Sequence, residues 1–149
     1  MPRIHALSAT LLLLVLLILV AGCGAGSEPA MVPEEHHTPP IFSDMTYEEA
    51  TAAAASEGKL LILDATASWC RPCKEMDKTT WVDETVVSWV REHAIAIQLD
   101  VDDRRPLATE LNVRSPLPTV AVFRDGEEVS RVVGKQTPEA LLEWLDGVL

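Results

Sequence analysis

The sequence predicts one α/β domain, in which a central mixed β-sheet is flanked by helices on both faces. Three observations support this fold class. From about residue 43 onward, capped helical segments alternate with short apolar runs that are typical of strands. Asp125-Gly126, a dipeptide typical of tight hairpins, separates the last two of these runs. The chain has 149 residues, which suits one domain better than two.

The first half of the domain is predicted to be helix, strand and helix. Thr46 and Glu49 have the spacing of a capping box, an alanine-rich stretch follows them, and Gly58 is placed to end the helix. The apolar run 60–63 is typical of a buried strand. A second helix is expected over 70–80.

The second half of the domain contains the remaining helices and strands. A βαβ unit followed by a ββα unit produces a mixed sheet covered on both faces. In chain order, the expected elements are a helix capped by Asp83, a strand over 94–101, a short helix over 106–111, strands over 119–123 and 128–133, and a last helix capped by Thr137.

The N-terminus has the pattern of an export signal. Residues 11–20 are an unbroken apolar run, preceded by Arg3 and followed by small residues. The run is shorter than the roughly 20 residues that span a bilayer, although an uncleaved anchor is the alternative. Residues 20–23, Val-Ala-Gly-Cys, resemble the lipobox of bacterial lipoproteins. This resemblance implies that 1–22 is removed and that Cys23 carries a lipid, the alternative being an ordinary buried or free cysteine.

Residues 23–42 are predicted to form the lipidated cysteine and a flexible tether, and 43–149 the folded domain. The tether is rich in Gly, Pro, Ser and Glu and lacks hydrophobic periodicity. His36 and His37 lack further ligands nearby, so we predict no metal site there. The net charge of −11 disfavours nucleic acid as a partner, because phosphate repels an acidic protein.

The motif Cys70-Arg71-Pro72-Cys73 carries the predicted chemistry. It follows a strand and opens a helix, where unpaired backbone N–H groups and the helix dipole stabilise a thiolate. We expect Cys70 to be the exposed nucleophile and Cys73 the resolving thiol. Arg71 adds a nearby positive charge that tunes the thiol, and Pro72 is tolerated in the first helical turn.

Half of a zinc site and a structural disulfide are the alternative interpretations of this motif. Zinc needs two more ligands, and His93 is the one histidine within the predicted domain. A disulfide that closes so short a loop contributes little stability. We therefore expect a redox pair and no metal.

Residues 61–76 resemble the active-site segment of thioredoxins. Asp64 lies six residues before Cys70, where thioredoxins place a buried acid. Residues 117–119, Leu-Pro-Thr, resemble the cis-proline loop of that family, and Gly134 matches the glycine after its hairpin. The resemblance implies the thioredoxin fold.

The resemblance covers about 42–149. Among relatives, the chain is most similar to the C-terminal domain of the transmembrane thiol–disulfide interchange protein. The shared features are the extended segment 74–86 and the Leu-Pro-Thr triplet.

The resemblance also implies roles for particular residues, with no cofactor. Asp64 would take the proton from Cys73, and burial would raise its pKa, the alternative being a solvent-exposed aspartate at a strand end. Pro118 would follow a cis peptide bond, and the backbone of Leu117 would bind an extended client segment. Trp69 would form an apolar wall beside the redox pair, unless it is a core residue.

Three positions depart from the thioredoxin pattern. Arg71-Pro72 replaces Gly-Pro, Gln98 occupies the place of a lysine near the buried acid, and Thr66 replaces a tryptophan. Loss of the lysine charge should make Asp64 harder to ionise. These changes affect the expected reduction potential and rate rather than the reaction.

Taken together, these features predict a lipid-anchored, extracytoplasmic thiol–disulfide reductase. Its partners would be disulfide-bearing exported proteins, such as apocytochrome c and periplasmic thioredoxin-like proteins, and a transmembrane electron donor, because exported compartments oxidise thiols. The anchor at Cys23 would hold it on the periplasmic side of an inner or outer membrane, or on the outer face of a Gram-positive membrane. The alternatives are a disulfide oxidase or isomerase and a non-catalytic binding or assembly module.

Overall fold

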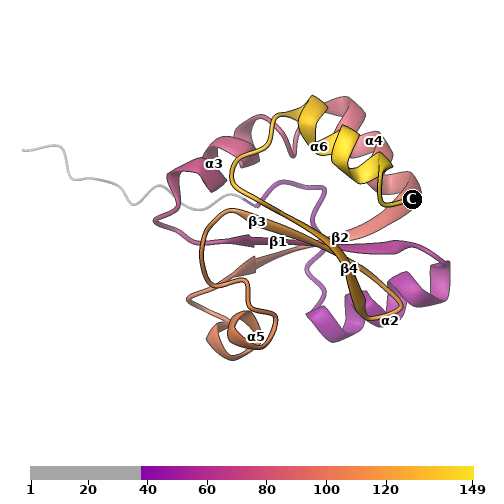
Figure 1. The fold of residues 1–149 in the computed structure, drawn as a ribbon, viewed down its shortest axis with the longest axis horizontal. Helices are drawn as coiled ribbons and strands as arrows, with labels where there is room; N and C mark the ends of the chain where they lie inside the picture. The colour runs from indigo at the N-terminus through magenta and orange to yellow at the C-terminus, as the bar shows by residue number, and fades with distance from the viewer. Residues whose placement is uncertain (1–37) are drawn as a thin grey trace, which may run out of the picture. The chain divides into compact units, whose positions relative to one another are not determined.

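The computed structural model describes residues 38–149, which fold around a four-stranded sheet of order β2-β1-β3-β4. Helices α2 and α5 cover one face, and α3, α4 and α6 cover the other (Figure 1). The elements are α2 Tyr47–Glu57, β1 Leu60–Thr66, α3 Arg71–Lys78, α4 Glu84–His93, β2 Ala94–Asp100, α5 Arg105–Glu110, β3 Thr119–Arg124, β4 Glu127–Val133 and α6 Pro138–Asp146.

This architecture confirms the predicted fold class and the predicted order of elements. The main difference is β1, which extends to Thr66 rather than ending at Leu63. Polar Asp64 and Thr66 obscured the end of the strand in the sequence. Both are nevertheless buried, because β1 is a central strand that pairs with β2 on one side and β3 on the other.

Alternation along β1 divides the core between the two faces of the sheet. Leu61, Leu63 and Ala65 belong to a cluster that includes α2 residues, whereas Leu60 and Ile62 belong to one that includes α4 and α6 residues. β1 runs parallel to β2 and antiparallel to β3. These pairings place the carboxyl ends of β1 and β2 at the same edge, where α3 begins.

The helix and hairpin signals read from the sequence are present. At the start of α2, the Thr46 N–H donates to Glu49 Oε2 at 2.9 Å and the Glu49 N–H donates to Thr46 Oγ1 at 3.2 Å. Gly58 ends this helix with a φ of 64°. Asp125 and Gly126 have φ values of 53° and 83°, as a tight hairpin between β3 and β4 requires.

Packing of the domain begins slightly earlier than the predicted boundary at residue 43. Phe42 is buried, and its ring lies 4.9 Å from that of Trp81 in an edge-on contact. The Ser43 N–H donates to the carbonyl of Ala96 at 2.8 Å, so the chain is already held against β2. The aromatic contact of Phe42 could not be read from a proline-rich sequence.

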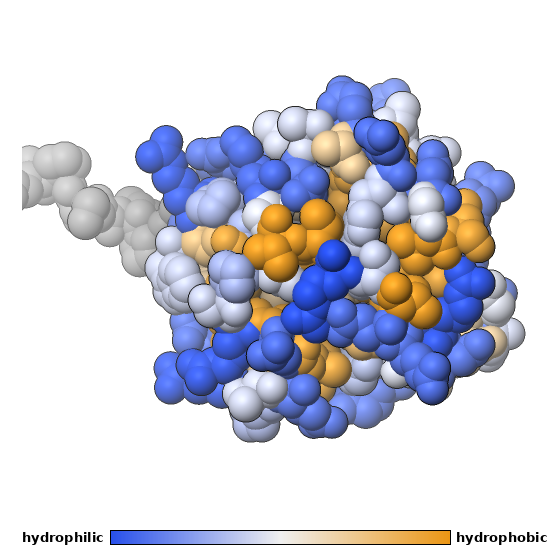
Figure 2. All heavy atoms as spheres, in the orientation of Figure 1, coloured by the Kyte–Doolittle hydropathy of each residue, from blue (hydrophilic) through white to orange (hydrophobic). Residues whose placement is uncertain are grey.

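The predicted signal 1–22, the lipidated Cys23 and most of the tether lie outside the described residues. Within 38–149, none of the helices has the length and apolar character needed to cross a bilayer. The face of the domain in Figure 2 is largely hydrophilic, with separate apolar patches.

Candidate active site

The two cysteines lie where β1 delivers the chain to the start of α3. Cys70 is the N-cap of α3, and Pro72 lies in its first turn. Cys70 and Cys73 form a disulfide, with Cα atoms 5.3 Å apart. The Cys73 N–H donates to Cys70 Sγ at 3.3 Å. In the reduced protein, a thiolate at Cys70 would accept hydrogen bonds from the unpaired backbone N–H groups at the start of α3. These hydrogen bonds favour the charged form of the thiol.

Cys70 is buried in this disulfide form, contrary to the exposed position predicted for it. It has an exposed fraction of 3%, and Cys73 has 1%. The reason is packing: both cysteines belong to the core cluster between the sheet and α2, and Leu117 packs against that cluster. The expectation of an exposed thiol rested on the start of the helix and did not take this packing into account.

Trp69 directly precedes Cys70, and Leu117 in the loop before β3 packs against the core cluster that contains both cysteines. Trp69 is 65% exposed, so it is not a core residue, and its indole N–H donates to Asp102 Oδ2 at 2.7 Å. The Leu117–Pro118 peptide bond is cis, as the resemblance implied. The Ser115–Pro116 bond is also cis, which no feature of the sequence had indicated.

Asp64 is a buried acid, as predicted, and its exposed fraction is 1%. Gln98 is its register partner on β2 and donates from Nε2 to Asp64 Oδ2 at 3.0 Å. Burial raises the pKa of Asp64 to about 7, the Gln98 hydrogen bond lowers it, and the charge of Asp77 raises it. The expectation that Gln98 replaces a cation near the acid is met.

Asp77 is the site residue that the sequence analysis missed. It is 8% exposed, and its Oδ1 accepts a hydrogen bond of 2.9 Å from the same Gln98 amide nitrogen that binds Asp64. One neutral amide therefore bridges two buried carboxyl groups. The signal was present: Asp77 follows Cys73 by four residues in a helix, so both side chains lie on its inner face.

Arg71 is placed less favourably for tuning Cys70 than its position in the sequence suggested. Its side chain is 90% exposed, and its Nε lies 3.3 Å from Glu75 Oε1. Glu75 also binds Lys135 at 2.8 Å, and that contact is the main cause that lowers the pKa of Glu75. The charge of Arg71 is thus partly offset by Glu75 and screened by water.

Within residues 38–149, no group of three or more His, Cys, Asp or Glu side chains is arranged to hold a metal ion.

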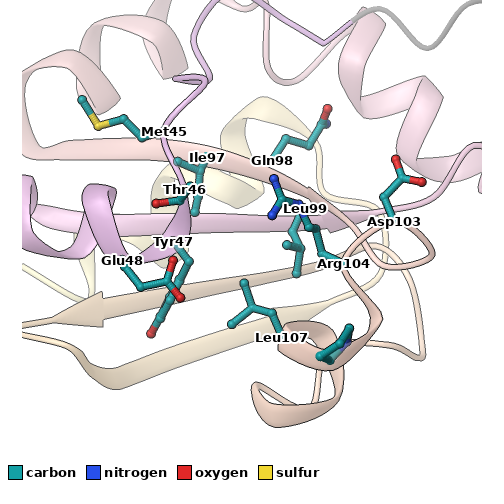
Figure 3. Close-up of a pocket in the computed structure, with 11 residues that line it drawn as sticks. Met45, Thr46, Tyr47, Glu48, Ile97, Gln98, Leu99, Asp103, Arg104 and Leu107 are labelled. Carbon is teal, nitrogen blue, oxygen red and sulfur yellow. The ribbon is translucent and has the colours of Figure 1, made fainter.

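A hollow of about 390 Å³ lies beside β2, with Tyr47, Leu99 and Leu107 among its lining residues (Figure 3). Neither cysteine lines this hollow.

Comparison with known proteins shows that this chain is similar to thioredoxins. Residues 47–149 match the family model for a thioredoxin-like domain. The chain is 35% identical to an H-type thioredoxin of Fagopyrum esculentum over 95 residues, covering 64% of this chain and 78% of the relative. It is 38% identical to a thioredoxin of Staphylococcus aureus over 90 residues, covering 60% and 83% of the two chains.

Solved structures of thioredoxins are similar as well. A thioredoxin from Thermus thermophilus has a TM-score of 0.62 at 25% identity, covering 68% of this chain and 82% of that chain. A mutant thioredoxin from Halobacterium salinarum has a TM-score of 0.55 at 28% identity, covering 75% and 95%.

Proposed function

Because the chain belongs to the thioredoxin-like domain family, we propose that it reduces disulfide bonds in exported proteins, with Cys70 as nucleophile and Cys73 as resolving thiol. The observation that carries this proposal is the Cys70–Cys73 disulfide at the start of α3, the helix that also carries the buried carboxyl group of Asp77. A dithiol in this position has a thiolate stabilised by the helix start and a second sulfur within reach.

The reaction transfers two electrons and two protons to the client. The Cys70 thiolate attacks one sulfur of the client disulfide, forms a mixed disulfide and releases the first client thiolate. Cys73 then loses its proton and attacks Cys70 Sγ, which forms the Cys70–Cys73 disulfide and releases the second client thiolate. The two client thiolates take up protons, and the oxidised pair is reduced again by an electron donor.

Asp64 is the proposed acceptor of the proton from Cys73. A general base is most effective when its pKa is near the working pH, and burial raises the pKa of Asp64 to about 7. Gln98 holds Asp64 in place and links it to Asp77, which lies one helical turn beyond Cys73. The amide of Gln98 is neutral and so leaves the pKa of Asp64 high, whereas a cation at the same position would lower it.

The cellular setting is also part of the proposal. A lipid on Cys23 would hold the domain at the outer side of a membrane, where a transmembrane dithiol carrier would supply electrons. The lipobox resemblance of residues 20–23 supports this setting, and so does the need for a reductant in an oxidising compartment. Client proteins would include apocytochrome c and other thioredoxin-like proteins of the same compartment.

Trapping tests the proposed roles of the two cysteines. In the full-length chain, Cys73→Ser should hold clients as stable mixed disulfides on Cys70, to be identified by mass spectrometry. The matched variant Cys70→Ser should trap none. Equal trapping by both variants, or none by either, would contradict the assignment.

The reduction potential distinguishes reduction from oxidation of clients. A value near the roughly −270 mV of thioredoxin supports a reductase, whereas one near about −120 mV, typical of a strong disulfide oxidant, supports an oxidase. Complete rescue of a deletion strain by Cys70→Ser would instead favour a binding or assembly role without turnover.

A further inference from the structure

A second cavity, of about 500 Å³, lies at the carboxyl ends of β1 and β2, beside the active-site loop. Its walls include Thr66 and Ser68 at and after the end of β1, and Asp100, Asp102 and Asp103 at and after the end of β2. Asp102 connects this cavity to the redox site, because its Oδ2 accepts from the indole N–H of exposed Trp69 at 2.7 Å.

The charge of this cavity is negative but partly offset. Asp100 is fixed by its own turn, since its Oδ1 accepts from the N–H groups of Asp102 at 2.9 Å and Asp103 at 3.4 Å. Arg105 lies 3.6 Å from Asp102, and Arg104 lines the cavity. Three carboxylates and one arginine therefore line the cavity, and this balance favours a positively charged ligand.

Thr66 is an independent indication of a ligand. It is 1% exposed, lines the cavity, and its Oγ1 has no hydrogen-bond partner among the residues that the structure describes. A buried hydroxyl group without a partner is destabilising. Thr66 is the register partner of Asp100, so the hydroxyl and the carboxylate stand on neighbouring strands at the same level.

We propose that this cavity binds the ammonium or guanidinium group of a client residue that lies near the client disulfide. Such a group donates several hydrogen bonds, to Thr66 Oγ1 and to carboxylates such as Asp100 and Asp103. The preferred substrates are therefore disulfides flanked by lysine or arginine. This inference rests on the proposed disulfide reduction and adds a substrate class to it.

The test uses three disulfide-linked peptides that differ in one residue near the cysteine: lysine, glutamine or glutamate. The full-length chain is reduced, freed of reductant and mixed with each peptide, and the single-turnover rate is measured at low and high salt. We expect the lysine peptide to react about fivefold faster than the glutamate peptide at low salt, the size of a modest ion-pair effect.

Matched variants test whether this cavity causes the preference for the lysine peptide. The double variant Asp100→Asn/Asp103→Asn should reduce the lysine-to-glutamate ratio to about one, and Thr66→Val should lower it without loss of stability, because no hydrogen bond is broken. The control Asp125→Asn removes a charge in the remote β3–β4 turn and should preserve the ratio.

The possible failures are distinguishable. Equal rates for the three peptides, or equal loss of preference in Asp125→Asn and in the double variant, would overturn the binding of a basic side chain and leave disulfide reduction intact. Absence of reaction with all three peptides would overturn the proposed function and this inference with it.

Discussion

At the scale of single residues, the buried carboxyl group of Asp64 is the proposed proton acceptor and also affects stability. Its pKa of about 7 in the folded state exceeds the value of about 3.9 in an unfolded chain. The folded state therefore holds this proton more tightly. From about pH 4 to pH 7 the unfolded chain has already lost the proton, so this group makes the protein less stable as the pH rises.

Asp64→Asn should remove this pH dependence. Asparagine keeps an acceptor for Gln98 and avoids a buried charge, so the gain in unfolding free energy should be larger at pH 8 than at pH 5. The difference between the two pH values should be at most about 3 kcal/mol, because part of the full effect is already present at pH 5. Urea unfolding of the oxidised protein at the two pH values measures it, and a gain independent of pH would contradict the assignment.

Asp77→Asn provides the matched control at the same hydrogen-bonding amide. The asparagine oxygen can still accept from Gln98, but the charge that raises the pKa of Asp64 is gone. The upper limit of the pH range over which stability falls should therefore move to a lower pH, while the lower limit at about pH 4 stays the same. An unchanged range would show that the two carboxyl groups do not interact.

At the scale of elements, the start of α2 shows how a local signal fixes a helix boundary. Thr46→Ala removes the Oγ1 that accepts from the Glu49 N–H. We expect a loss of about 1 kcal/mol in unfolding free energy, typical of an N-cap, measured by urea unfolding. Ser56→Ala, in the exposed last turn of the same helix, is the control and should be nearly neutral. Equal losses of unfolding free energy in the two variants would show that the effect comes from general helix packing rather than from the Thr46 cap.

At the scale of the whole molecule, what the sequence revealed depended on how local each signal was. Caps, the Asp-Gly hairpin and the Cys70–Cys73 pair involve neighbouring residues, so their patterns predicted the order of elements. Cys70 is buried in a core cluster built from distant parts of the chain, and the bridge from Asp64 to Asp77 requires Gln98 on another strand. Such contacts exist only once the sheet has assembled, which is why the sequence could indicate Asp64 and its neighbour Gln98 but not the bridge to Asp77.

The proposed membrane attachment also belongs to this scale, since it would determine which disulfides the domain can reach. In a bacterial host that processes lipoproteins, the mature chain should begin at Cys23 and carry the added mass of its acyl groups. Cys23→Ser should lose that mass and the cleavage before residue 23, because the hydroxyl group replaces the thiol that accepts the lipid. Cys70→Ser is the matched control and should be processed normally. Intact-mass spectrometry of membrane fractions makes the comparison, and a wild-type chain that begins at Met1 without added mass would contradict the anchor while leaving the redox chemistry of Cys70 and Cys73 unaffected.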